Sequence, residues 1–125
     1  MEIIRYGLQL TKPVTGRQII DAMKKICGIQ TVLFSHSGLR TQGELLYVLG
    51  CRGKYSQSGD AMITVEGQTV VDPGKTYKQI EVFNHPWIEK IGNPWKEEYL
   101  KVPRRGDIQR FLEKLKEKLE EEFSK

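Results

Sequence analysis

The sequence has little cysteine and little histidine, with two residues of each among 125. Cys27 and Cys51 lie far apart, and no two of these four residues have the short spacing of a zinc knuckle. We therefore expect neither a metal site nor a cofactor. We expect the two cysteines to be free thiols. The alternative is a redox pair, because the topology inferred below brings both to one end of a sheet.

Long apolar runs are missing too. No segment approaches the roughly 20 apolar residues that a membrane helix needs. Residues 1–5 lack the basic start, apolar core and small-residue cleavage site of a secretory signal. We therefore expect a cytoplasmic protein without a membrane partner. No repeat, low-complexity segment or linker divides the chain, so residues 1–125 are expected to form a single domain that can bury a core.

Strong charge of one sign is absent, because the net charge is only +4. Residues 1–105 carry fifteen Lys and Arg against ten Asp and Glu, whereas residues 106–125 carry five against six. The basic surplus thus belongs to the body of the fold and not to a tail. A surplus of this size permits contact with nucleic acid or another polyanion without requiring it.

The clearest element is a helix that begins near residue 15. Thr15-Gly16-Arg17-Gln18 matches a capping box, in which the Thr and Gln side chains satisfy backbone amides reciprocally. Apolar residues then recur at helical spacing as far as Cys27, and Gly28 suits the C-terminal stop. Before this helix, residues 2–10 alternate between apolar and polar and predict a strand, which Lys12-Pro13-Val14 ends.

The rest of the chain predicts five more strands and a long amphipathic helix. The order strand, helix, five strands, helix favours an α+β fold: a single antiparallel or mixed sheet of five to six strands with two helices packed on it. The first strand and the strand after the helix should form a right-handed parallel pair if they share the sheet. In this order the chain resembles helix-grip folds, which curl a sheet around a C-terminal helix. The expected strands are 29–34, 44–50, 61–65, 68–71 and 77–83, and the expected helix is 107–123.

Counting chain reversals assigns each loop to one of two ends of the sheet. A strand of about seven residues spans roughly 23 Å, so loops at the two ends cannot form one compact site. We call these the helix-start end, where the first helix begins, and the far end. With simple hairpins, the helix-start end collects 12–18, 35–42, 66–68 and 84–87, and the far end collects 28, 51–59 and 72–76.

The helix-start end has the composition of a small anion site. The N-terminus of the first helix would offer unpaired backbone amides to a phosphate or carboxylate. Arg17 and Arg40 could add bidentate contacts, and Ser35 and Ser37 could add hydroxyl groups. This combination predicts recognition of a nucleotide or another phosphate-bearing ligand.

The same end is also expected to hold both histidines. His36 follows one strand and His85 follows the last strand, so His36 and His85 could act as proton donor and acceptor near neutral pH. In that case the site would cleave a phosphodiester without a metal. The plainer interpretation is that His36 lies in an ordinary polar loop and that His85, which precedes a proline, only shapes a turn.

The far end is basic and rich in glycine. Arg52 and Lys54 could neutralise phosphates, and Tyr55 could stack on a base. Lys75 is expected at this end as well. The plainer interpretation is a solvated turn.

Three functions therefore remain open. The first is a non-enzymatic binding module for a nucleotide or nucleic acid. The second is a metal-independent enzyme that cleaves a phosphodiester with His36 as general acid or base. The third is an interaction or assembly protein that docks through the segment containing Trp87 and Trp95, with a homodimer as one form.

Overall fold

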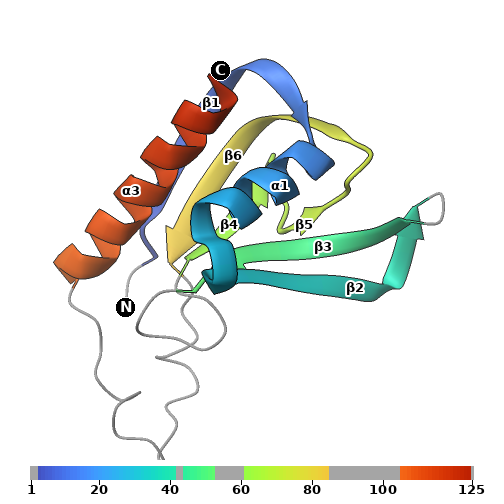
Figure 1. The fold of residues 1–125 in the computed structure, drawn as a ribbon, viewed down its shortest axis with the longest axis horizontal. Helices are drawn as coiled ribbons and strands as arrows, with labels where there is room; N and C mark the ends of the chain where they lie inside the picture. Colours follow the sequence, from blue (N-terminus) through green and yellow to red (C-terminus); the bar gives the residue numbers. More distant parts are fainter. Residues whose placement is uncertain (1–2, 42–43, 53–60, 85–104, 125) are drawn as a thin grey trace, which may run out of the picture.

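The computed structural model describes residues 3–41, 44–52, 61–84 and 105–124, and for residues 34–41, 44–45 and 105–108 it describes the backbone alone. Within these ranges the chain forms six strands, two α-helices and a short 3-10 helix (Figure 1). No helix there is long and apolar enough to span a membrane. The elements are β1 (Arg5–Thr15), α1 (Gly16–Cys27), η1 (Gly28–Gln30), β2 (Thr31–Thr41), β3 (Glu44–Cys51), β4 (Ala61–Val65), β5 (Val70–Val71), β6 (Thr76–Asn84) and α3 (Arg105–Phe123).

The strands form one antiparallel sheet in the order β1-β6-β4-β3-β2, with β5 paired to β3. The predicted α+β fold, with a single sheet and two helices, is confirmed. β1 and β2 run in the same direction but form opposite edges of the sheet, so the expected parallel pair does not form. The reason is that β6 returns to pair with β1, and β4 and β3 then lie between β6 and β2.

The direction of β6 differs from the expectation. The chain turns at Glu66 and Gly67, both of which have positive φ, and Val65 and Gln68 form a bridge. After this turn, however, β5 does not run back along β4. It pairs antiparallel with β3, as the start of β4 does, so β4 and β5 run in the same direction. β6 therefore runs opposite to the predicted direction, because β5 continues along β3 after the turn instead of running back along β4.

Because β6 runs opposite to the predicted direction, the two segments that flank it lie at exchanged ends of the sheet. Residues 72–76 lie at the helix-start end, where Thr76 pairs with Thr15. Asn84 lies at the far end, where it pairs with Ala61 and Ala61 pairs with Cys51. The predicted positions of residues 72–76 and of Asn84 are both wrong.

The core lies between the sheet and the two helices, which cover one face (Figure 1). In β1 and β6, alternate residues such as Leu8 and Leu10, and Ile80 and Val82, belong to the core cluster, as the period of two requires. α1 and α3 each contribute a stripe of apolar side chains to the same cluster. The fully buried members include Ile19, Ile20, Met23, Leu49, Ile63, Ile80, Val82, Leu112 and Leu119.

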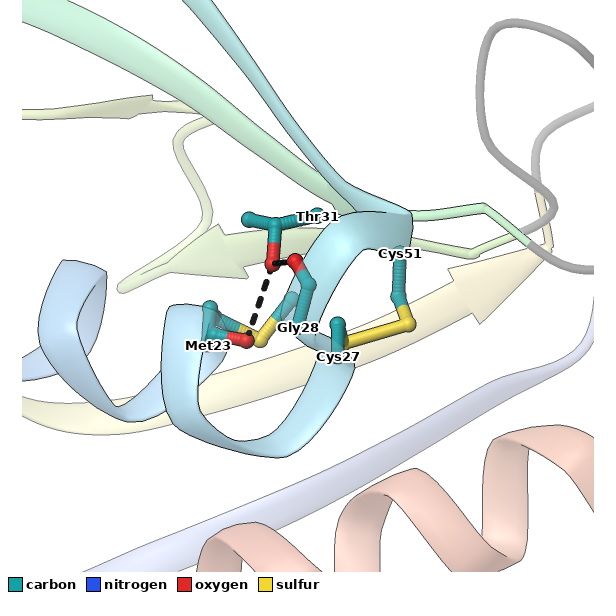
Figure 2. The surroundings of a disulfide bond; sticks show 5 residues. All are labelled: Met23, Cys27, Gly28, Thr31 and Cys51. Atoms are coloured by element: carbon teal, nitrogen blue, oxygen red, sulfur yellow. Dashed lines mark hydrogen bonds between the residues drawn. A yellow bond between two sulfur atoms is a disulfide. The ribbon is translucent and has the colours of Figure 1, made fainter.

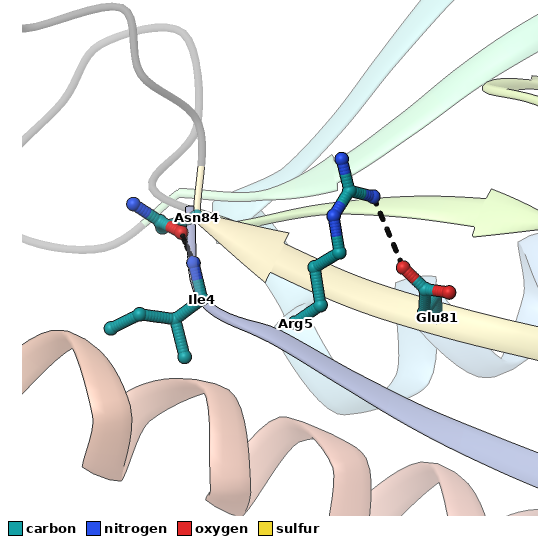
Figure 3. A network of polar contacts seen from close by, with 4 residues as sticks. All are labelled: Ile4, Arg5, Glu81 and Asn84. Atoms are coloured by element: carbon teal, nitrogen blue, oxygen red, sulfur yellow. Dashed lines mark hydrogen bonds and ion pairs between the residues drawn. The ribbon is translucent and has the colours of Figure 1, made fainter. Parts of the chain in front are cut away.

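Polar contacts join β1 to β6 at the far end (Figure 3). The backbone N–H of Ile4 donates to Oδ1 of Asn84, and the N–H of Asn84 donates to the carbonyl of Ile4 (3.3 Å). Because Asn84 is buried, these bonds satisfy groups that would otherwise be costly to bury. On the opposite face of the sheet, the Arg5 guanidinium pairs with Glu81 (3.1 Å) and lies over the Phe83 ring.

A disulfide joins Cys27, the last residue of α1, to Cys51, the last residue of β3 (Figure 2). Their Cα atoms are 5.9 Å apart, within the usual range for such a bond. The expectation of free thiols is therefore wrong. The sequence order correctly brought both cysteines to the far end, but spacing along the chain could not show that their Cβ atoms face each other.

β1 continues beyond its predicted end and leads directly into α1. Four residues of β1, 10–13, lie opposite Lys78 alone on β6, which makes an extended bulge. Pro13 lacks an N–H group and fits such an unpaired stretch. Thr15 then forms the predicted capping box: its Oγ1 accepts from the N–H of Gln18 (3.1 Å), and Oε1 of Gln18 accepts from the N–H of Thr15 (2.8 Å).

Gly16 approaches the turn at residues 72–75 more closely than any side chain would allow. Its N–H donates to the carbonyl of Lys75 (2.8 Å). A Cβ at this position would lie 2.0 Å from the carbonyl oxygen of Asp72 and 2.9 Å from Cα of Pro73. Both obstacles are backbone atoms, so neither can move aside alone. Glycine at position 16 therefore sets where α1 begins relative to β6.

We expect Gly16→Ala to lower the free energy of unfolding by about 3 kcal/mol, because the added methyl group forces two backbone segments apart. Gly7→Ala is the matched control, because its Cβ would meet only Cγ of Glu81 at 3.9 Å. That variant should keep its stability or gain up to about 1 kcal/mol. Urea unfolding measures both. Equal effects of the two substitutions would contradict the assigned role of Gly16.

Candidate functional site

Four cationic side chains gather at the helix-start end of the sheet. They are Lys12, Arg17, Lys75 and Lys78, which we call the helix-start surface, and all four are exposed. Lys12 lies in the β1 bulge opposite Lys78. Arg17 and Lys75 lie on the two segments that meet at Gly16, since the N–H of Arg17 donates to the carbonyl of Pro73 (3.1 Å).

These four side chains have no partner within the described ranges. The ion pairs there join Arg5 to Glu81, Lys25 to Glu122 and Lys116 to Glu120. None involves the helix-start surface, and its four side chains form no hydrogen bond with a described residue. Asp21 lies one turn along α1 from Arg17 but is not ion-paired with it. Among the described residues, the surface therefore has four cations that are exposed and not ion-paired.

The carboxylates in the neighbouring turns are already engaged. Oδ1 of Asp72, a buried residue, accepts from the N–H of Gly74 (2.9 Å). Oε1 of Glu66 accepts from the N–H of Lys78 (3.4 Å). Both carboxylates thus bond to the backbone of these turns, and neither forms an ion pair with a described cation.

The first turn of α1 does not offer the unpaired amides that the sequence led us to expect. The N–H groups of Gly16, Arg17 and Gln18 donate to Lys75 O, Pro73 O and Thr15 Oγ1 respectively. These are the amides that a helix leaves without an internal partner at its N-terminus. The expectation of an amide-lined anion site is therefore wrong, and an anion at this end must be bound by side chains.

An open hollow of about 490 Å³ lies beside the helix-start surface. Glu66, Lys75, Thr76 and Tyr77 are among the residues that line it. The hydroxyl of Tyr77 accepts from the N–H of Asp72 (2.9 Å), and burial raises the pKa of this phenol above its ordinary value, with smaller contributions from Asp72 and Glu66. Tyr77 is thus a neutral structural group that holds the turn.

The predicted ligand residues of the 35–42 segment lie in a strand and not in a loop. Ser35 and His36 pair with Tyr47 and Leu46, and Arg40 pairs with Leu45. The register shifts between His36 and Arg40, which leaves residues 37–39, including Ser37, as extra residues on the β2 side. β2 is the edge strand farthest from β1, so three strands separate the β2 residues from the β1–α1 junction that carries Arg17.

The two histidines are not brought together by the topology as predicted. His85 lies outside the described residues. Asn84, which precedes it, ends β6 at the far end, whereas β2 runs from the far end at Thr31 toward the helix-start end. The predicted proximity of His36 and His85 depended on the opposite direction for β6.

The far end carries Arg52, which is exposed and whose N–H donates to the carbonyl of Gln30 (2.7 Å). Lys54 and Tyr55 lie outside the described residues. Lys24 and Lys25 are exposed nearby on the last turn of α1, and Lys25 forms an ion pair with Glu122 of α3 (3.1 Å). The described part of this end therefore has fewer unpaired cations than the helix-start surface.

Sequence reasoning identified only Arg17 of the helix-start surface as a ligand residue. It placed Lys75 at the far end and did not single out Lys12 or Lys78. The alternation of β6 could not have identified Lys78, because it places Lys78 on the same face as Ile80 and Val82, which are buried. Within the described ranges, no group of three or more His, Cys, Asp or Glu residues is arranged to hold a metal ion.

No protein-family model, curated protein or solved structure matches the chain.

We expect the phenol of Tyr77 to titrate at higher pH than an ordinary tyrosine, because burial disfavours the phenolate. A raised folded pKa means that this contribution to stability is fully present below the ordinary pKa of about 10 and is lost as the pH rises through the folded pKa. Tyr77→Phe should lower stability at pH 7 by about 1–2 kcal/mol, because it leaves the N–H of Asp72 unpaired.

Phenolate absorbance of the wild type minus that of Tyr77→Phe isolates the titration of Tyr77. Urea unfolding between pH 7 and 11 gives the stability of both proteins, and the wild type should lose stability more steeply above pH 10. A difference titration at the ordinary tyrosine pKa would contradict this account of Tyr77.

Proposed function

We propose that this chain is a non-enzymatic module that binds a phosphate-bearing ligand, and that the ligand is the sugar–phosphate backbone of a nucleic acid. The observation that supports the proposal is the helix-start surface, where four exposed cations have no partner among the described residues. Exposed Lys and Arg side chains bind phosphates by neutralising charge and releasing condensed counterions.

An extended polyanion suits this surface better than a single nucleotide does. The N–H groups of Gly16, Arg17 and Gln18, in the first turn of α1, already donate hydrogen bonds within the chain. They therefore cannot bind a phosphate. The neighbouring hollow is lined by one cation, Lys75, and by the carboxylate of Glu66, which would repel a phosphate placed there. The cations instead lie on separate segments: the β1 bulge, the start of α1, the turn before β6 and β6 itself.

Contacts of this kind carry no sequence information. Phosphate contacts position a protein on nucleic acid, whereas contacts to base edges specify the sequence. We therefore expect binding that depends steeply on salt and little on sequence, with dissociation constants of about 10⁻⁴ to 10⁻⁶ M at physiological salt.

The two alternatives gain no such support. Cleavage of a phosphodiester by His36 and His85 required both histidines at one end, and β6 runs toward the other end. Docking through Trp87 and Trp95 concerns residues outside the described ranges. Both alternatives stay predictions from the sequence.

We expect the fourfold variant Lys12→Ala, Arg17→Ala, Lys75→Ala, Lys78→Ala to lose most of its affinity for single-stranded RNA or DNA. The slope of log K against log salt should become shallower by about 0.7 for each phosphate contact removed. Fluorescence anisotropy between 50 and 200 mM salt measures both quantities with a labelled oligonucleotide.

A control variant with the same loss of charge separates the effect of where the cations lie from the effect of net charge. Lys24→Ala, Arg52→Ala, Lys114→Ala, Lys118→Ala also removes four exposed cations, all of them outside the helix-start surface. This control should retain most of the affinity and the salt slope. An equal loss in both variants would reject the helix-start surface as the site, and a wild type without salt-sensitive binding to any oligonucleotide would reject the function.

A further inference from the structure

The last turn of α1 is held differently from the rest of the helix. Residues Ile19, Ile20, Ala22 and Met23 are buried, with at most 4% of each exposed. After Met23, no residue of α1 or η1 is buried: Ile26 and Cys27 are half-buried and the others are exposed. Apolar packing is therefore complete as far as Met23 and only partial beyond it, where Ile26 and Cys27 pack against the core with part of their surface exposed.

Among the described residues, the hydrogen bond from the N–H of Arg52 to the carbonyl of Gln30 (2.7 Å) and three further contacts hold this segment in place. The Cys27–Cys51 disulfide bonds it to the end of β3. Nζ of Lys25 contacts the carboxylate of Glu122 in the last turn of α3 (3.1 Å). Oγ1 of Thr31 donates to the carbonyl of Gly28 (2.7 Å) and also contacts that of Met23 (3.3 Å), as Figure 2 shows beside the disulfide. Among these contacts, only the disulfide is covalent.

We propose that the Cys27–Cys51 disulfide is a redox latch that orders the last turn of α1 and η1, and that its reduction releases this segment while the sheet and the first two turns of α1 stay folded. This inference does not depend on nucleic-acid binding, because the latch lies at the opposite end of α1 from the helix-start surface. The other contacts of this segment between described residues are non-covalent polar contacts, and the Lys25–Glu122 ion pair and the hydrogen bond from Thr31 to Gly28 are exposed, so they hold the segment weakly.

The reductant is a dithiol, and Cys27 is the sulfur that it reaches. Cys27 is half-buried, whereas only 7% of Cys51 is exposed. A thiolate of the dithiol attacks Sγ of Cys27, the bond between the two sulfurs breaks, and Cys51 leaves as a thiolate that takes up a proton. The second thiol of the reductant then attacks the mixed disulfide and releases Cys27. The chain gains two electrons and two protons, and the dithiol becomes a disulfide.

Reduction of the disulfide would also affect an exposed apolar side chain, that of Ile29. Ile29 lies between the disulfide and Thr31, and 97% of it is exposed. In the oxidised chain the latch and the Thr31 hydrogen bonds present this isoleucine in one place on η1. In the reduced chain the same residue belongs to a segment that can leave the sheet.

Hydrogen–deuterium exchange on the whole chain tests the latch, with reduced dithiothreitol as the probe. Thiol counting first confirms that the folded chain has been reduced. Reduction should speed amide exchange of residues 24–30 by at least about tenfold, whereas amides of β6 and of residues 20–23 should change by less than about twofold. Removal of the dithiothreitol and reoxidation should restore slow exchange.

The variant Cys27→Ser, Cys51→Ser is the control. It should exchange like the reduced wild type, and dithiothreitol should have no effect on it. If that variant does not fold, the wild type with and without dithiothreitol still decides the question. The proposal is overturned if the folded chain resists dithiothreitol, if reduction unfolds the sheet, or if residues 24–30 exchange equally fast in both states.

Discussion

The contact between Gly16 and the turn at residues 72–75 is the constraint on which the rest of the structure depends. It is a backbone-to-backbone contact between the start of α1 and the segment that precedes β6, and it leaves no room for a side chain. Because of it, β1 and β6 are neighbours as far as Thr15, and the first amides of α1 are bonded to the turn. The same contact brings Arg17 next to Lys75, so the helix-start surface follows directly from it.

Local patterns predicted the parts of the fold that depend on neighbours in sequence. The capping box at Thr15 and Gln18 is present as expected, and the terminal helix begins within two residues of its predicted start. The direction of β6 was not predictable in this way. Counting reversals assumes that each turn folds the chain back on the strand just completed, but after Glu66 and Gly67 β5 pairs with β3 instead of with β4, the strand just completed. Such an exchange depends on strands that are distant in sequence.

The same reasoning explains which site residues the sequence revealed. Arg17 was found because it follows a recognisable cap. Lys75 was assigned to the wrong end because of the direction of β6, and Lys12 was not recognised because the β1 bulge opposite Lys78 leaves no local signature. To predict the disulfide, one must know that the end of α1 lies close to the end of β3. The spacing of the two cysteines along the chain does not give this distance. α1 thus connects two ends with different chemistry: exposed cations that pair with no described residue where it begins, and a covalent bond where it ends.

The central claim is that the helix-start end, and not the far end, contacts the ligand. The most direct measurement is a titration of the ¹⁵N-labelled chain with a single-stranded oligonucleotide, followed by amide chemical shifts. The account predicts that the largest shift changes fall on the amides of Lys12, Arg17, Lys75 and Lys78 and of their neighbours, and that they diminish as salt is added. Largest changes around Lys24 and Arg52, or no changes at low salt, would contradict it.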